Sequence, residues 1–385
     1  MARAIALLVI LLVAWPAWGA DEPVAPYRDA AEARPTLAEE DRVWAAGERG
    51  EQAFIKSGHV YPDPALNLYL QTVLDRLFPE FVGALRVQAA NDSGLNAFAL
   101  PQGAIFVNMG LLARLENEAQ LATILAHEGS HFTHRHAYQN NQKAKSLSGF
   151  ARTAGMLTGG VGALLGDLAA NSSMSGYSQD LEREADLQGF RRMAQAGYDV
   201  RESVKAFELL AEEVTVLDVK EPYFFANHPR LQERIESFNA LIAGYDGPAG
   251  ETGEDRYSEV TRSLREQWLR AQLSEGKPKS IIHVLANPAM LVRYPVHAPY
   301  YLGESYRLRG NTGDTEKAVA AWRQAIVKAP EFAPSYRALG IQAMKQRDWA
   351  QARELLGGYL RLAPDAGDAA YIRNYLELVE EKLKS

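Results

Sequence analysis

Apolar residues recur at helical spacing in the first folded part of the chain and predict two helices. Thr36 and Glu39 have the spacing of a capping box, which predicts a helix that reaches about Lys56. Asp63 and Pro64 suit the N-cap and the first position of a second helix. Behind them, apolar residues recur every three or four positions: Leu66, Leu70, Val73, Leu74 and Leu77. We expect this second helix to pack on the sheet that follows it.

Three short stretches with strand character come next. They cover residues 85–90, 96–100 and 104–108, and Pro101-Gln102-Gly103 forms a turn between the last two. We expect a small antiparallel sheet. Helical patterns then dominate, over residues 117–136, 179–195, 200–214 and 229–243. A few strands followed by many helices is typical of an α+β fold.

A turn-rich segment and a sequence repeat divide the chain in two. Residues 245–254 read YDGPAGETGE, so few contacts are expected to cross them, and we place a linker at 246–254 between a domain over 21–245 and a second domain. Beyond it, similar residues stand 34 apart: Pro330 and Pro364, Ala318 and Ala352, Trp322 and Leu356, Ala325 and Tyr359. The repeat resembles the tetratricopeptide (TPR) repeat, whose paired helices stack into a solenoid with a peptide-binding concave face. Because two repeats seldom suffice, further helices in 256–290 and 369–383 are expected to complete an all-α domain over 255–385.

The N-terminus has the pattern of a secretory signal peptide. Arg3 precedes an apolar run from Ala4 to Ala14, and small residues follow, which predicts cleavage near Gly19 or Ala20. The run is too short for a permanent bilayer span, and no cysteine is present for lipid attachment or disulfides. We therefore expect residues 1–20 to direct the protein to the periplasm, without a stable transmembrane anchor after cleavage.

Charge narrows the class of partner. The net charge is −7, and no dense block of Lys and Arg is present to neutralise phosphates, so no nucleic-acid partner is expected. A protein or peptide is the expected ligand.

The candidate chemistry begins with His127-Glu128-Gly129-Ser130-His131, an H-E-x-x-H pattern within the predicted helix 117–136. Residues four apart lie on one face of a helix, so both imidazoles can reach one tetrahedral Zn²⁺, with Glu128 beside them. By composition such a match arises by chance in about one chain of this length in a hundred, and two surface histidines are the alternative.

A second pattern supplies what the first lacks. Glu182 and Asp186 stand four apart on the predicted helix 179–195. A carboxylate at Glu182 would complete a His₂Glu ligand set with the fourth position open to water, and Asp186 would accept the N–H of a ligand histidine. Exposed acidic pairs are common on helices, so the assignment depends on the upstream motif.

Four sequence blocks together resemble the HtpX-type gluzincin metallopeptidases, and more closely their periplasmic TPR-containing branch, the β-barrel assembly-enhancing protease type. The blocks are NAFALPQGAIFVNMGLL at 96–112, EAQLATILAHEGSH at 118–131, ExxAD at 182–186 and HPxxxxRI at 228–235. The resemblance implies a zincin-like peptidase domain that binds one zinc ion through His127, His131 and Glu182. It also implies that Glu128 is the catalytic carboxylate and Asp186 an active-site acid. The residues themselves instead favour Asp186 as a hydrogen-bond acceptor for a ligand histidine.

The expected reaction is the hydrolysis of a peptide bond. Zinc lowers the pKa of a water toward about 7, Glu128 takes its proton and later protonates the leaving amine. His228 and Arg234 are the candidates for stabilising the oxyanion, since the family carries both near the active site. His228 has two alternatives: it binds the open zinc position and holds the enzyme inactive, or it caps the helix that follows.

Other features stay open at this level. The stretch 96–100 is either a strand that pairs with an extended substrate or an ordinary hairpin strand. The glycine-rich stretch 150–176 is expected to form a lid rather than a membrane element. The remaining histidines are interpreted as structural or solvated: His59, His134, His136, His283 and His297.

The favoured function is an endopeptidase of envelope protein quality control that degrades misfolded or stalled proteins in outer-membrane β-barrel assembly. The TPR repeats would recruit these substrates or the assembly machinery. The rival is a TPR chaperone or scaffold whose zinc site is latent or structural.

Overall fold

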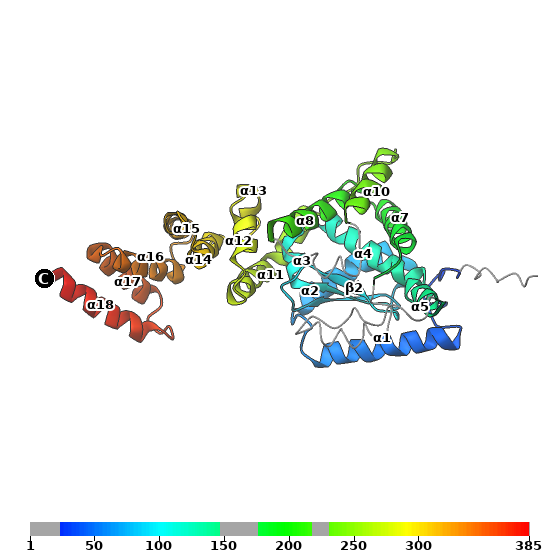
Figure 1. The fold of residues 1–385 in the computed structure, drawn as a ribbon, viewed down its shortest axis with the longest axis horizontal. Helices are drawn as coiled ribbons and strands as arrows, with labels where there is room; N and C mark the ends of the chain where they lie inside the picture. Colours follow the sequence, from blue (N-terminus) through cyan, green and yellow to red (C-terminus); the bar gives the residue numbers. More distant parts are fainter. Residues whose placement is uncertain (1–23, 147–175, 218–230, 385) are drawn as a thin grey trace, which may run out of the picture.

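The computed structural model describes residues 24–146, 176–217 and 231–384. The predicted signal peptide, nearly all of the stretch 150–176, and His228 lie outside the described residues. Figure 1 shows a body that holds the sheet and helices α1 to α10, from which a row of helices, α11 to α18, leads away to the C-terminus.

Helices make up most of the structure. The body holds α1 (Ala38–Lys56), α2 (Pro64–Leu77), α3 (Met109–Arg114), α4 (Glu118–Thr133), α5 (His136–Ser146), α7 (Gln179–Gln195), α8 (Glu202–Leu217), α10 (Leu231–Ala243) and the 3-10 turn η1 (Pro79–Phe81). The row holds α11 (Glu254–Ser274), α12 (Pro278–Leu285), α13 (Pro288–Leu291), α14 (Ala298–Arg309), α15 (Asp314–Lys328), α16 (Ala333–Lys345), α17 (Trp349–Leu362) and α18 (Ala369–Lys384). The predicted mostly helical fold with a small sheet is confirmed. Across the three described ranges, no helix has both the length and the apolar character needed to cross a bilayer.

The sheet has three strands in the order β1-β3-β2. β2 (Ala97–Ala99) and β3 (Ala104–Asn108) form the predicted antiparallel hairpin. β1 (Arg86–Ala90), however, runs parallel to β3, so the expectation of a purely antiparallel sheet is wrong. After β1 the chain crosses to the position of β2 and then returns through the hairpin to β3, which lies between the two. β2 is therefore an edge strand of the sheet.

The starts of the first two helices show one correct and one wrong cap prediction. Asp63 accepts hydrogen bonds from the backbone N–H groups of Ala65 and Leu66, as an N-cap should. Thr36 and Glu39 form no capping box, because α1 starts after Leu37 without a side-chain cap. The Thr36 N–H instead donates to Glu40, whose carboxylate is also held by Tyr27 and Arg135.

Helix α4 lies at the centre of the body. Every residue from Glu118 to Thr133 is buried, and the helix contacts α2, α7, α8 and strands β2 and β3. Asn117 caps it by accepting the N–H of Gln120. A helix buried all round is held by neighbours on every side, so its side chains are positioned far more tightly than those of a surface helix.

The segment 246–254 is tied to the body, so the expectation that few contacts cross it is wrong. Glu251 exchanges backbone hydrogen bonds with Gly197 and Asp199, and the Thr252 carbonyl accepts from the N–H of Ala119 at the start of α4. The apolar core of the body continues into α11, α12 and α14. The placing of the domain boundary at this segment stays a prediction.

The C-terminal row contains two close helix pairs. At Gly303 of α14 an added Cβ would lie 2.4 Å from Nε1 of Trp322 on α15, and at Gly340 of α16 it would lie 2.6 Å from Leu356 on α17. Only glycine lets each pair approach this closely. Gly303 and Trp322 stand three positions further apart in the chain than Gly340 and Leu356, which fits an insertion in the loop 310–314.

Candidate active site

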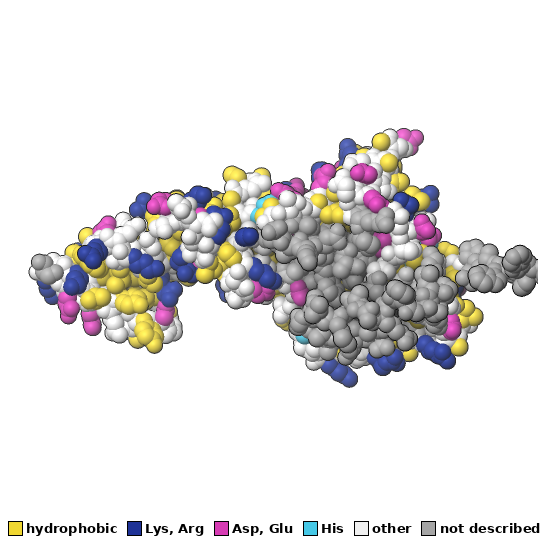
Figure 2. Space-filling view, viewed as in Figure 1, with side chains coloured by type: hydrophobic (Ala, Val, Ile, Leu, Met, Phe, Trp, Pro, Cys, Tyr) yellow, Lys and Arg dark blue, Asp and Glu magenta, His cyan; other side chains and the backbone are white. Residues whose placement is uncertain are grey.

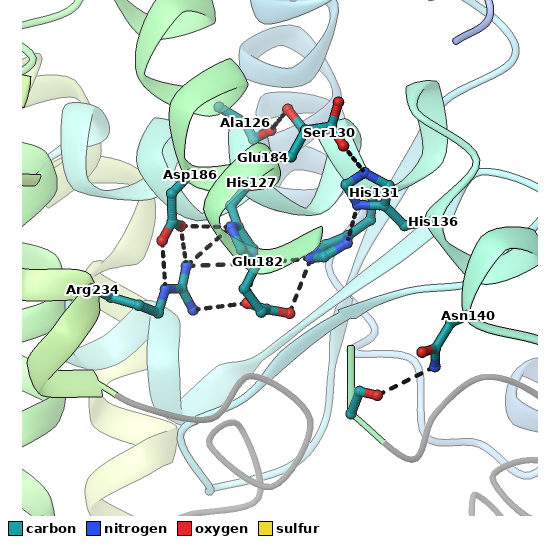
Figure 3. Close-up of polar contacts among 11 residues, drawn as sticks. Ala126, His127, Ser130, His131, His136, Asn140, Glu182, Glu184, Asp186 and Arg234 are labelled. Carbon is teal, nitrogen blue, oxygen red and sulfur yellow. Dashed lines mark hydrogen bonds and ion pairs between the residues drawn. The ribbon is translucent and has the colours of Figure 1, made fainter. Parts of the chain in front are cut away.

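The two histidines of the H-E-x-x-H motif lie one turn apart on α4 and converge. His127 and His131 are 1% and 2% exposed, and their Nε2 atoms are 3.0 Å apart. Figure 3 shows the two rings meeting over Glu182.

Glu182 comes from a later helix in the chain, α7. Its Oε2 lies 3.5 Å from Nε2 of His127, and its Oε1 lies 3.6 Å from Nε2 of His131. Helix α7 reaches this position because Gly189 passes close to the backbone of Ala126 and His127, where an added Cβ would come within 3.3 Å. The predicted convergence of three side chains from two helices is therefore present.

The three side chains fit a zinc ion. They form a buried group whose ligand atoms all lie within 4.8 Å of one another. Tetrahedral ligands about 2.0 to 2.1 Å from zinc stand roughly 3.3 to 3.4 Å from each other, close to the separations found here. Two imidazole nitrogens and one carboxylate oxygen are also the donor set of catalytic zinc sites, which keep a position open.

Glu128 is next to this group on the same helix and is also buried. Within the described residues, the metal-binding group consists of His127, His131 and Glu182 and does not include Glu128. The negative charges of Glu128 and Glu182, after burial, raise the pKa of Tyr177, which places both carboxylates near its phenol. Glu128 thus follows the first ligand histidine on α4 and is not itself one of the three metal-binding residues.

Asp186 and Arg234 lie behind His127 (Figure 3). Oδ1 of Asp186 is 2.9 Å from Nδ1 of His127, the nitrogen that faces away from the metal position. Arg234, on α10, donates from Nε to Asp186 at 3.0 Å, and its Nη1 lies 3.6 Å from Glu182. Burial lowers the pKa of Arg234, but the charges of Asp186 and Glu182 outweigh this and raise it, so the guanidinium stays protonated.

These contacts bear on two expected roles. Asp186 lies within hydrogen-bonding distance of Nδ1 of His127, and its role as an acceptor for the N–H of a ligand histidine stays a prediction. Arg234 is 3% exposed, lies over the ring of Phe207 and is engaged by two carboxylates. Its geometry is that of a counter-ion for the ligand shell, and its role in oxyanion stabilisation stays a prediction, as does that of His228.

Sequence reasoning missed a third histidine. His136 was interpreted as structural or solvated, yet it is fully buried and its Nδ1 lies 2.8 Å from Nδ1 of His131. Its Nε2 lies 3.3 Å from Glu184, whose side chain is 43% exposed. Tyr177 stacks on His131, with 3.9 Å between the centroids of the two rings.

A buried helix that presents two histidines, met by a carboxylate from a following helix, defines the class of zinc metallopeptidases with a glutamate as third ligand. The sequence comparison agrees with this class, because residues 64–242 match the family model described as Peptidase family M48. Residues 64–242 are therefore similar to M48 peptidases, and the predicted family resemblance is confirmed.

Relatives with names cover the same region. A protein of Vibrio cholerae serotype O1, named provisionally as a beta-barrel assembly-enhancing protease, is 31% identical over 189 residues, which are 46% of this chain and 39% of that protein. The beta-barrel assembly-enhancing protease of Escherichia coli K12 is 27% identical over 184 residues, 45% of this chain and 38% of that protein. The mitochondrial metalloendopeptidase OMA1 of Saccharomyces cerevisiae is 29% identical over 192 residues, 47% of this chain and 51% of that protein. The chain thus spans about two fifths to one half of the length of these relatives.

Proposed function

We propose that this protein is a zinc-dependent endopeptidase. The observation that carries the proposal is the buried group of His127, His131 and Glu182, with Glu128 beside it on the same helix. M48 peptidases are zinc-dependent, and the relatives described above are named as a protease and a metalloendopeptidase.

The three ligands would hold the zinc ion, which acts as a Lewis acid and lowers the pKa of water to about 7. Glu128 takes a proton from the attacking water while the oxygen of that water forms a bond to the peptide carbonyl carbon. When the carbon–nitrogen bond breaks, Glu128 gives this proton to the leaving amine. Glu128 therefore ends the reaction in the state in which it began.

The residues behind the ligands fix the chemistry of His127. With Nε2 turned toward the metal position, Nδ1 carries the proton and donates a hydrogen bond to Asp186 at 2.9 Å, while Nη2 of Arg234 also lies 2.9 Å from Nδ1. Arg234 places a positive charge beside the carboxylates of Asp186 and Glu182 within a buried site. These contacts fix the positions of His127 and Glu182 and do not involve Glu128, the residue that would transfer the proton.

Substrate would bind as an extended strand along β2. This strand is at the edge of the sheet and lies against α4, which carries the histidines. Edge strands offer unpaired backbone groups in an alternating row, which suits sequence-tolerant recognition of unfolded chain.

The setting we propose is the periplasm, in quality control of outer-membrane β-barrel proteins. Support comes from the predicted signal peptide at 1–20 and from relatives named for β-barrel assembly. The yeast relative is named as mitochondrial, so the shared peptidase region does not by itself define the compartment. Fractionation of cells that express the full chain tests this part of the proposal.

The C-terminal row is proposed to be a TPR-like domain that recruits misfolded envelope proteins or the assembly machinery. The close pairs α14/α15 and α16/α17 support it. Hydrophobic side chains gather over α17 and α18 in Figure 2, and Tyr371, Tyr375 and Leu378 are exposed at helical spacing along α18. Such an exposed stripe suits binding to apolar segments of a partner.

The rival function is a chaperone or scaffold with a latent or structural zinc site. The Glu128→Gln variant separates the two, because it keeps the shape and the ligands but removes the base. We expect it to retain zinc while casein cleavage falls by about 10²- to 10⁴-fold. Undiminished function in cells without the carboxylate would favour the chaperone.

His228→Ala, if fully active, would remove both functional roles considered for that residue.

A further inference from the structure

We propose that His136 is a positioning residue for the zinc ligand His131, which it holds through a hydrogen bond between the two Nδ1 atoms. The inference rests on the proposed zinc site but not on the proposed cleavage reaction. It assigns a role to a histidine outside the H-E-x-x-H motif.

The direction of this hydrogen bond follows from the geometry. Nε2 of His131 faces His127 and Glu182, so this nitrogen must be unprotonated to bind a metal ion, and the ring proton is then on Nδ1. Nδ1 of His136 lies 2.8 Å from Nδ1 of His131. Because Nδ1 of His131 is then the donor, Nδ1 of His136 must be the acceptor of this hydrogen bond. The His136 proton is consequently on Nε2, which faces Oε2 of Glu184 at 3.3 Å. His131, His136 and Glu184 thus form a chain in which each donor meets an acceptor.

The backbone between the two histidines is built to bring them together. Residues five apart do not share a face of one continuous helix. Here α4 ends at Thr133, and Arg135 takes the left-handed conformation with φ of 59° before α5 starts at His136. This turn folds the His136 ring back onto His131.

A left-handed arginine is uncommon and persists only where its surroundings hold it. Arg135 donates from Nε and Nη2 to the two carboxylate oxygens of Glu40, at 2.8 Å and 2.6 Å. Glu40 is fully buried and also accepts from the hydroxyl of Tyr27. The unusual turn is therefore fixed by α1 and by the segment before it.

Tyr177 restrains the tilt of the His131 ring. Its ring lies nearly parallel to the His131 imidazole, with 13° between the planes and 3.9 Å between the centroids. The stack restrains tilting of the ring, while His136 restrains its rotation in its own plane. Metal ligands whose second nitrogen is held in this way bind metal more tightly than unsupported ones.

The test measures zinc affinity of the full chain by competition with a chromophoric chelator, together with the visible spectrum of the Co²⁺-loaded protein. His136→Leu fills the space but offers no acceptor, and we expect it to weaken zinc binding by about 10- to 100-fold and to change the Co²⁺ spectrum. His136→Asn places an acceptor oxygen near the position of Nδ1, and we expect it to recover most of the affinity. If His136→Leu does not fold, His136→Ala takes its place.

His134→Ala is the matched control, because His134 is on the same turn but its Nδ1 lies near the Ser130 carbonyl and not near a ligand. Its zinc affinity should equal that of the wild type. The proposal is overturned if folded His136→Leu binds zinc as the wild type does, if His136→Asn loses as much as His136→Leu, or if His134→Ala loses as much. A wild-type protein that binds zinc but cleaves nothing would refute the proposed function and leave this result intact. Absence of zinc binding by the wild type would overturn both.

Discussion

At the scale of single residues, the site is a small set of buried groups in which each ligand has its own support. Nδ1 of His127 faces Asp186, and Nδ1 of His131 faces His136. Glu182 lies within reach of Arg234. Supporting contacts of this kind fix ring orientation and tautomer before the metal arrives, which lowers the cost of binding it.

Asp186→Asn should weaken zinc binding by about 10- to 100-fold, because the neutral amide is a poorer acceptor for His127 and leaves Arg234 less well balanced. Chelator competition measures the change. Asp180→Asn, on the exposed first turn of the same helix, is the control and should bind zinc as the wild type does. Equal affinities in all three proteins would show that Asp186 has no part in holding the ligand.

Sequence spacing was enough to find the ligands but not all of their supports. Residues four apart on one helix, such as His127 with His131 or Glu182 with Asp186, share a face whatever the rest of the fold does. His136 could not be found in this way, because its contact depends on a left-handed turn at an arginine, and no local pattern marks such a turn. The sequence shows only that two further histidines, His134 and His136, follow the motif, and not which of them reaches a ligand.

At the scale of elements, the metal helix is anchored at its first residue by a buried carboxylate. Glu118 accepts hydrogen bonds from the hydroxyls of Tyr69 and Tyr198 and from Arg256 of α11. Burial raises the pKa of Glu118, but the hydrogen bonds from Arg256, Tyr69 and Tyr198 outweigh burial and lower it. The ionised carboxylate therefore stabilises the fold, joining α2, α4, α11 and the loop after α7 at one point.

Glu118→Gln should lower the free energy of unfolding at pH 7 by about 2 kcal/mol, since charged hydrogen bonds are lost. Because the folded pKa is lowered, the contribution of the carboxylate is fully present above its unfolded pKa of about 4.3 and is lost as the pH falls through the folded value. Denaturant unfolding from pH 7 to pH 3 should thus show the gap between variant and wild type closing in acid. Asp255→Asn, at an exposed position in the first turn of α11, should show no gap at any pH. A gap that stays constant into acid would contradict this assignment.

Element positions were easier to predict than their pairing. The strongly periodic stretch 179–195 coincides with α7, and Asp63 caps α2 as its position before Pro64 indicated. The parallel pairing of β1 with β3 was missed, because strand pattern gives the faces of a strand and not its neighbour. The capping box of Thr36 and Glu39 failed because α1 starts one residue later, after Leu37, and Glu39 instead accepts a hydrogen bond from Gln142, 103 positions away in the chain.

At the scale of the whole molecule, the body and the start of the C-terminal row share one core. Side chains from the row donate hydrogen bonds to backbone carbonyls of the body: Tyr257 to Leu112, Arg265 to Leu115, Trp268 and Gln272 to Ser93, and Tyr294 to Ala113. The last helices, α16 to α18, have small clusters of their own, built on Leu356 and Val379. A turn-rich linker in the sequence therefore need not separate two independent bodies.

Truncation tests this arrangement. Removing residues 330–385 should leave the melting temperature of the body and its zinc affinity nearly unchanged, because α11 to α15 remain in place. Removing residues 254–385 uncovers the apolar core that α11 and α12 complete, and should lower the melting temperature by more than about 4 °C, the shift that roughly 1 kcal/mol produces in domains of this size. If the body is as stable without α11 as with it, the result would support the predicted boundary between independent domains at 246–254.

The central claim is that three side chains from α4 and α7 hold one zinc ion. Its most direct test is the zinc content of wild-type protein and of Glu182→Gln after dialysis against a moderate chelator, with the exposed Glu208→Gln as control. The account predicts one zinc ion per chain in the wild type and the control, and loss of zinc from Glu182→Gln. Retention of zinc by Glu182→Gln at the wild-type level would contradict it.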